Sequence, residues 1–325
     1  MPQPSLYYAC GRIGILRHNL LTRQQMERLI SARDYDEACR LLSDSGYMDS
    51  ADADFQTAAD AHVEKACKMI ERVTCDESLT DCFLLRYDIH NLKVLLKSRY
   101  LQVKPEYLSA CGTLQLEKLR HAVIEHQYKG LPPILSQTMD ELEAALAKSF
   151  DPLLIDARLD QALCEMIREK LKKVKLPAVH SYFAAMTDLK NLMMALRLQG
   201  MRKSESMLQK LILPGGKLSM EKLVSCIKDA SKMKEAFAPY GKKVLSAALE
   251  CMEDLSALSQ LEKAADDHLL SILGSTRYQA AAPEILLSYL LTTQREAANV
   301  RLVMTGKLNG FAVKQIEERL REWHD

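Results

Sequence analysis

Three segments of the chain carry a carboxylate and a side-chain amide three residues apart, which is a spacing that could support acid–base or metal chemistry. The pairs are Asp88 with Asn91, Asp188 with Asn191, and Glu296 with Asn299. Residues three apart share one face of a helix. Around the first pair, that face also carries Leu84, Leu85, Leu92, Leu95 and Leu96.

A carboxylate and an amide in an apolar stripe cost free energy unless they are hydrogen-bonded. A line of acids facing a ligand is one interpretation, and hydrogen bonding to exposed backbone at the ends of neighbouring helices is the other. The structural interpretation is favoured, because three copies of one catalytic site in a single chain would be unusual. Mutation of the three acids would separate the two roles.

A second repeated element precedes each pair and ends in an aspartate. It reads FQTAAD up to Asp60, IDARLD up to Asp160 and LEKAAD up to Asp266. The spacing from that aspartate to the asparagine is 31, 31 and 33 residues. The helix that carries Asp60 is therefore the natural neighbour of the helix that carries Asp88.

A third element follows only the first two copies. It reads GTLQLEKL over 112–119 and GKLSMEKL over 216–223, with 310–320 as a distant candidate in the third copy. The three elements recur in one order with a period of about 100 to 108 residues, which is longer than that of the usual helical repeats. The chain is therefore predicted to contain three related subdomains.

We place the subdomains at residues 1–120, 121–225 and 226–325, within one compact unit, with the N-terminal helices packing on the third subdomain. Three alike subdomains could close around a pseudo-threefold axis and leave a central opening. The sequence equally permits an open arc.

Other groupings of reactive residues are incomplete. His121 and Glu125 are spaced for a metal but lack a further ligand, and the loop 213–218 has Leu211 where a phosphate loop needs its first glycine. The basic run from Arg168 to Lys175 fits a solvated helix end better than a contact with a headgroup or partner. We predict no catalytic residue, no cofactor and no metal.

The composition favours an all-α fold. Gly and Pro number only 12 and 10, and no Pro lies between Pro4 and Pro105. A net charge of +1 argues against a nucleic-acid binder, and no apolar stretch is long enough to span a membrane. The nine Cys include no C-x-x-C pair, so we interpret them as small buried hydrophobes of a cytoplasmic protein.

The helical pattern divides the chain into long segments. A capping box at Thr22 opens the first, and Pro177 is expected to stop the segment that Asp151 and Pro152 open. Further helices are predicted at 35–42, 51–73, 80–101, 220–234, 242–273, 283–305 and 313–323.

Several short motifs in order resemble one family over essentially the whole length. They are YACGRI at 8–13 followed by Leu20 and Leu21, LLSDSGY at 41–47, the D-x-x-N-L copies, and EAANVR at 296–301. With them the chain resembles the C subunit of bacterial and archaeal V-type (A-type) rotary ATPases, which is similar to the d subunit of the eukaryotic V-type ATPase.

The resemblance implies a funnel of three helical subdomains that binds no nucleotide and is not itself an enzyme. Such a subunit couples the central shaft to the membrane rotor ring, on the cytoplasmic face of the membrane, and transmits torque for proton or sodium transport. Lys93 and Arg301 are candidate partner contacts, and the middle copy has Met193 at their position.

Two alternatives stay open. One is a generic all-α scaffold that binds a helix or peptide in a central groove. The other is a helical enzyme with an apolar cavity, acting on an isoprenoid or lipid.

Overall fold

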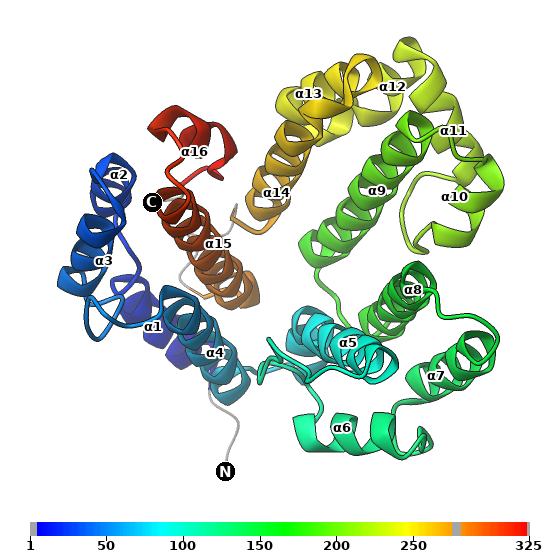
Figure 1. Ribbon diagram of the computed structural model, residues 1–325, viewed down its shortest axis with the longest axis horizontal. Coiled ribbons are helices and arrows are strands. Elements are labelled where there is room, and N and C mark those ends of the chain that lie inside the picture. Colours follow the sequence, from blue (N-terminus) through cyan, green and yellow to red (C-terminus); the bar gives the residue numbers. More distant parts are fainter. Residues whose placement is uncertain (1–4, 275–280, 324–325) are drawn as a thin grey trace. The chain divides into compact units, whose positions relative to one another are not determined.

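Every regular element in the computed structural model, which describes residues 5–274 and 281–323, is a helix, so the all-α prediction is confirmed (Figure 1). The α-helices are α1 (Leu6–Arg17), α2 (Arg23–Ser31), α3 (Tyr35–Asp44), α4 (Phe55–Val73), α5 (Glu77–Leu101), α6 (Leu116–Ile124), α7 (Pro133–Leu146), α8 (Pro152–Leu171), α9 (Pro177–Gly200), α10 (Glu205–Leu211), α11 (Met220–Lys228), α12 (Ala230–Phe237), α13 (Lys242–Glu253), α14 (Leu258–Gly274), α15 (Pro283–Leu308) and α16 (Val313–Arg319). Short 3₁₀ turns, η1 (Ala238–Tyr240) and η2 (Leu255–Ala257), follow α12 and α13. Within the described ranges, no helix is both long enough and apolar enough to cross a bilayer.

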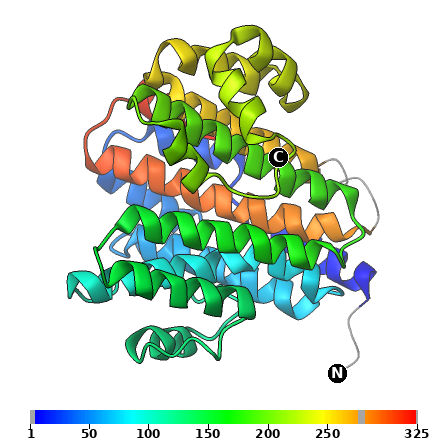
Figure 2. The same ribbon diagram turned by 90° about the vertical axis from the view of Figure 1, so that its right-hand side faces the viewer.

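The chain forms two compact units. One contains Met1–Cys75 and Gly241–Asp325, and the other contains Asp76–Tyr240. In the first unit α15 packs along α4 and also contacts α1, α3 and α14. In the second unit α5 and α8 lie side by side (Figure 2). The division into three subdomains at 120 and 225, and their closure around an opening, remain predictions.

The helices that carry the repeated pairs, α5, α9 and α15, are the longest and the most deeply buried. In α5, leucines at 84, 85, 92 and 96 are at most 2% exposed, and Ile89 lies among them. A helix that is apolar on most of its surface is stable only where protein covers it. These helices therefore form the core of the fold, and the loops pack against them.

Aspartates interrupt two predicted helices. Asp229 separates α11 from α12 and accepts a hydrogen bond from the backbone N–H of Ser231, and Asp254 does the same with Ser256 before η2. An aspartate side chain competes with helical hydrogen bonding and favours an N-cap. The predictions of continuous helices over 220–234 and 242–273 were therefore wrong.

Thr22 and Pro177 both lie at helix N-termini. The capping box at Thr22 is present, and Met26, Leu29 and Ile30 are buried as predicted. However, α8 already ends at Leu171, and Pro177 occupies the first turn of α9 instead of stopping α8. Proline is well suited to the first turn, where its missing N–H would have no partner in any case.

The three core helices end in the same way. Gln102, Arg202 and Gly310 each lie eleven residues after the repeated asparagine and adopt positive φ angles of 55°, 53° and 68°. The following residue then donates its N–H to the carbonyl five residues back, at 3.0, 2.9 and 2.8 Å. This is a left-handed C-terminal cap. The repeat therefore extends beyond the motifs that the sequence pattern identified.

Replacing Gln102 by glycine is expected to stabilise the second unit by about 1 kcal/mol, because only glycine adopts a left-handed conformation without a steric cost. The urea midpoint of the purified chain measures the effect. The matched variant Gly310→Ala should lower stability by a similar amount. Equal stability of both variants and the parent chain would contradict the assigned caps.

Candidate functional site: the repeated buried acids and amides

Asp88 fastens the loop that follows its own helix. The carboxylate is 0% exposed and accepts hydrogen bonds from the backbone N–H groups of Thr113 (2.9 Å) and Leu114 (3.0 Å), and from the Thr113 hydroxyl (2.7 Å). Burial raises the pKa of Asp88, while the three donors oppose the shift. The donors lie just before α6. The sequence suggested that they would come from the helix that carries Asp60, and this expectation was wrong.

Asp188 makes the same connection in the second copy. It accepts hydrogen bonds from the backbone N–H groups of Lys217 (2.9 Å) and Leu218 (3.0 Å). Lys217 stands where the first copy has Thr113, so it brings no hydroxyl, and the Tyr240 hydroxyl donates to Asp188 at 2.6 Å. Both carboxylates therefore receive two backbone donors and one hydroxyl.

The repeated glycine of the third element is required by this contact. A Cβ atom at Gly112 would lie 2.1 Å from Oδ1 of Asp88, and one at Gly216 would lie 2.2 Å from Oδ1 of Asp188. No side chain fits at such distances. The repeated glycine is therefore present because the repeated aspartate packs directly against its Cα atom.

The three asparagines hold a second point of the chain in an identical way. Each side-chain amide donates to, and accepts from, the backbone of a single residue, and the partners are Ser109 for Asn91, Leu213 for Asn191 and Arg321 for Asn299. The distances are 2.8 Å in both directions for Asn91 and about the same for Asn191, and 3.1 to 3.2 Å for Asn299. All three asparagines are at most 4% exposed.

In the third copy the acid reaches back to the N-terminal part of the chain. Glu296, which is 1% exposed, accepts a hydrogen bond from the backbone N–H of Leu21. Leu21 thus takes the place of Leu114 and Leu218, and in all three cases a helix begins two residues later, at Arg23 (α2), Leu116 (α6) and Met220 (α11).

A second set of contacts supports this equivalence. Eight residues after the asparagine, each core helix donates a side-chain hydrogen bond to a backbone carbonyl, from Arg99 to Val123, from Gln199 to Ile227 and from Lys307 to Ala32. These carbonyls lie at the C-terminal ends of α6, α11 and α2. The N-terminal segment therefore completes the third repeat.

The candidate counterpart at 310–320 was consequently wrong. That segment contains α16 and leads to Arg321, which Asn299 binds, just as α10 leads to Leu213, which Asn191 binds. The sequence pattern placed the missing element after the third copy. The structure supplies it from residues that precede the first copy.

The repeated aspartates form ion pairs at the surface. Asp160 on α8 pairs with Lys93 on α5 at 2.7 Å, and Asp60 on α4 pairs with Arg301 on α15 at 2.6 Å. The third aspartate, Asp266, pairs with Arg321 at 3.1 Å. Lys93 and Arg301, the candidate partner contacts, thus hold neighbouring helices together, and a contact with another protein remains a prediction for both.

One buried ion pair was not predicted from the sequence. Arg295 and Asp267 meet at 2.9 Å with both side chains 8% exposed, and Asp267 also accepts a hydrogen bond from the backbone N–H of Glu322. Burial lowers the pKa of Arg295. Each residue adjoins a repeated acid in the sequence, Asp266 or Glu296, but spacing alone did not distinguish a buried charge from an exposed one.

The repeated positions act as fasteners for loops. In the first two copies, backbone N–H groups and a hydroxyl donate hydrogen bonds to each carboxylate. Within the described ranges, no three His, Cys, Asp or Glu side chains come together in a way that could hold a metal ion. Glu296 differs, because its Oε2 atom is buried and has no hydrogen-bond partner among the described residues, as is also true of the Tyr47 hydroxyl.

This architecture defines a class of all-helical proteins built from long internal repeats, with interior acids and amides that tie loops to core helices. Residues 9–319 match the family model described as ATP synthase (C/AC39) subunit. The chain therefore belongs to this family, as its motifs predicted, and is a subunit of a rotary ATPase.

Individual relatives agree with this assignment. The chain is 24% identical to the C subunit of the V-type sodium ATPase of Enterococcus hirae, over 94% of this chain and 95% of the relative. It is 24% identical to the C subunit of the A-type ATP synthase of Methanosarcina mazei, over 96% and 92% of the two chains. The C subunit of the V-type ATP synthase of Thermus thermophilus is 31% identical over a shorter stretch, 36% of this chain and 38% of the relative.

The Gly112→Ala substitution should destabilise the chain by about 2 to 4 kcal/mol, because the new methyl group forces Asp88 away from its donors. Urea unfolding measures the loss. In an Asp88→Ala background the same substitution should cost much less, since the clash is gone. The control Gly11→Ala, at an open position in α1, should not destabilise; equal losses at Gly11 and Gly112 would refute the close packing.

The stability of the first unit should depend on the protonation of Glu296. Burial raises the pKa of Glu296 to about 7, from an ordinary value of 4.5. The folded state thus favours the protonated acid, so its contribution is fully present below about pH 4.5 and is lost as the pH rises through 7.

The Glu296→Gln variant should therefore be more stable than the parent chain at pH 8.5, by up to about 3 kcal/mol, and nearly equal to it at pH 4.5. Urea midpoints at the two pH values test this. The control Asp88→Asn turns its new NH2 group toward one of the backbone N–H donors at Thr113 and Leu114, so it should lose stability at both pH values. A gain for Glu296→Gln that is the same at both pH values would contradict the assignment.

Proposed function

We propose that this chain is the non-catalytic coupling subunit of its rotary ATPase, linking the central shaft to the membrane rotor ring. In this role it transmits torque for ATP-coupled transport of protons or sodium ions. One observation carries the proposal, namely that the family model matches from residue 9 to residue 319, so that almost all of the chain follows the plan of this family. The chain would sit at the periphery of the complex, on the cytoplasmic face of the membrane, in one copy.

The internal fastening of the loops suits a part that carries torque. A coupler must resist deformation, and buried, fully hydrogen-bonded polar groups in a close-packed interior are stiff. Asp88 and Asn91 fix two points of one loop against α5, and Asp188 and Asn191 do the same against α9. Three subdomains arranged as a funnel with a central opening would receive the shaft.

Exposed apolar side chains provide candidate contacts for the partner subunits. Leu101, Met201 and Leu308 lie at or next to the C-terminal ends of the three core helices and are 58%, 63% and 60% exposed. On α1, Tyr7 and Ile15 are 73% and 64% exposed. Large apolar side chains that are exposed near the end of each core helix are typical of surfaces that become covered in an assembly.

Co-purification with the other ATPase subunits tests the proposal. The full chain should recover shaft subunits or the ring, and should hydrolyse no ATP alone. The triple variant Leu101→Ser, Met201→Ser, Leu308→Ser should lose at least tenfold in affinity for these partners while its melting temperature changes little, because the positions are exposed. A matched triple replacement of Lys65, Lys203 and Lys314 by Ser removes exposed positive charges instead, and should retain binding.

Two results would contradict the coupling role. One is recovery of a helix-bearing partner unrelated to ATPases and of no shaft or ring subunit, which would favour a general scaffold. The other is a complex that transports ions at the full rate per ATP after this chain has been removed.

A further inference from the structure

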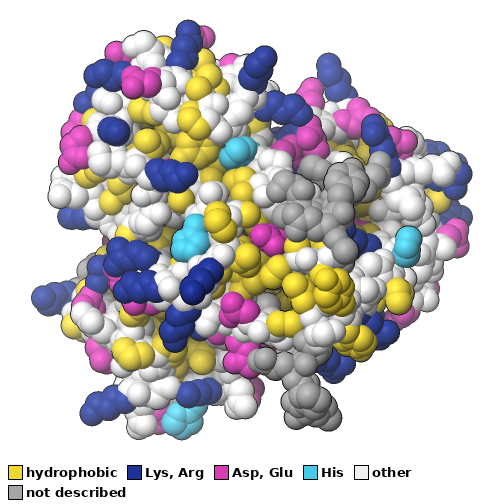
Figure 3. All heavy atoms as spheres, turned by 180° about the vertical axis from the view of Figure 1, so that it is seen from behind, with side chains coloured by type: hydrophobic (Ala, Val, Ile, Leu, Met, Phe, Trp, Pro, Cys, Tyr) yellow, Lys and Arg dark blue, Asp and Glu magenta, His cyan; other side chains and the backbone are white. Residues whose placement is uncertain are grey.

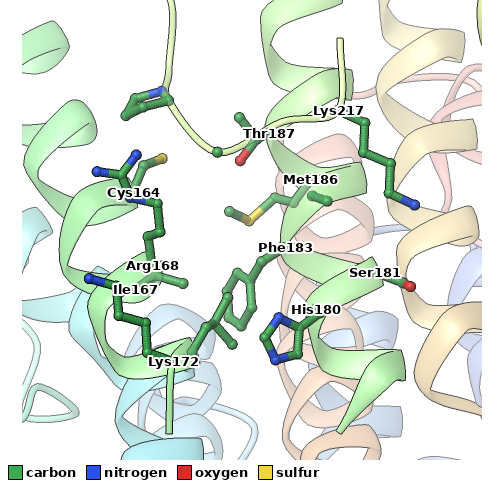
Figure 4. A pocket seen from close by; sticks show the side chains of 14 residues that line it. Cys164, Ile167, Arg168, Lys172, His180, Ser181, Phe183, Met186, Thr187 and Lys217 are labelled. Carbon is green, nitrogen blue, oxygen red and sulfur yellow. The ribbon is translucent and has the colours of Figure 1, made fainter. Parts of the chain in front are cut away.

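A pocket of about 400 Å³ lies in the second unit, between the C-terminal half of α8 and the N-terminal half of α9 (Figure 4). The loop that contains Pro214 and Gly215 closes one end of it. This loop is the one that Asn191 and Asp188 fasten, so the wall of the pocket is held firmly. Pockets of roughly 300 to 1,000 Å³ are the usual size for small-molecule ligands.

The walls of the pocket are mainly apolar. Side chains from both helices and the loop contribute, namely Ile167, Leu171, Phe183, Ala184, Met186 and Pro214. In Figure 4, Phe183 and Met186 point from α9 toward α8. Methionine and phenylalanine side chains adapt well to a flexible alkyl chain. The interior of the pocket therefore suits an apolar chain.

Positive charge borders one wall of the pocket. Arg168 lies in the last turn of α8, and Lys172 directly follows the helix, four residues further on. In Figure 4 both side chains lie along α8, across the pocket from Phe183 and Met186, whereas the Lys217 side chain points to the other side of α9. Lys172 pairs with Glu169 at 2.7 Å, but Arg168 forms no ion pair with any described residue. Lys and Arg side chains also gather around a histidine on the left of the face seen in Figure 3.

The position of these cations at the end of α8 has a structural explanation, since the C-terminal end of a helix favours positive charge. That explanation does not account for the apolar hollow beside them. An apolar pocket with a guanidinium at its border is complementary to a molecule with an anionic head and an apolar chain. Three segments wall this half-open pocket, and its volume fits one alkyl chain better than the broad face of a protein.

We propose that this pocket binds a single-chain anionic amphiphile, such as a fatty acid or an alkyl phosphate. The carboxylate or phosphate head contacts Arg168 and Lys172, and the alkyl chain lies against Phe183 and Met186. Binding to this site goes beyond the coupling role and does not depend on it.

Calorimetric titration of the full chain with monomeric dodecyl phosphate, below its micelle concentration, tests the site. One molecule should bind per chain. Dodecyl maltoside has the same alkyl chain with a neutral head, and inorganic phosphate has the charge without the chain, so each should bind at least tenfold more weakly. Equal affinity for dodecyl maltoside, or for inorganic phosphate, would overturn the proposal.

Variants separate the pocket from general surface charge. The Arg168→Gln, Lys172→Gln variant should weaken dodecyl phosphate binding at least tenfold. The matched variant Lys173→Gln, Lys175→Gln removes the same charge from the same basic run, but its positions do not line the pocket, so it should change affinity less than twofold.

A third variant, Ala184→Phe, fills the pocket and should abolish binding while its helical circular dichroism stays that of the parent chain. Equal losses in the two charge variants would overturn the proposal. Unchanged binding in a folded Ala184→Phe chain would do so as well.

Discussion

The burial of a carboxylate and an amide on each core helix is the constraint from which the rest of the structure follows. Such groups are tolerated in an apolar interior only when donors and acceptors meet them. Asp88 and Asn91 satisfy this condition by capturing the backbone of the loop beyond α5, and that capture requires glycine at position 112. Two side chains thus determine the path of more than 20 residues of chain, and the next copy repeats the solution with Asp188, Asn191 and Gly216.

The same constraint explains what the sequence could and could not predict. The pairs, their spacing and the helical class were recognisable because they depend on local periodicity. The hydrogen-bond donors could not be recognised, because every residue except proline has a backbone N–H and the residue type does not show which one donates. The helix breaks at Asp229 and Asp254 were missed because an aspartate fits both the exposed face of a helix and an N-cap, and only tertiary packing decides between them.

The third repeat shows how a substitution and a change of connectivity occur together. Asp88 and Asp188 are short acids that approach glycine closely, whereas Glu296 is one methylene longer and faces Leu21, which Asn19 precedes at the position of the repeated glycine. A longer side chain can reach a backbone that a β-carbon keeps farther away. Oε2 of Glu296 has no partner among the described residues, so Glu296 is the least well satisfied of the three repeated acids.

Completion of the third repeat by the N-terminal segment has a consequence for biosynthesis. Leu21 and Glu296 are 275 residues apart in the chain. At about 5 to 20 residues per second, a ribosome releases α2 and α3 well before it makes α16 and α15, the helices that pack on them. The apolar faces of α2 and α3 stay uncovered until α15 and α16 have been made, so closure of this unit is a late, long-range event. A nascent chain shorter than about 300 residues would present those faces to chaperones.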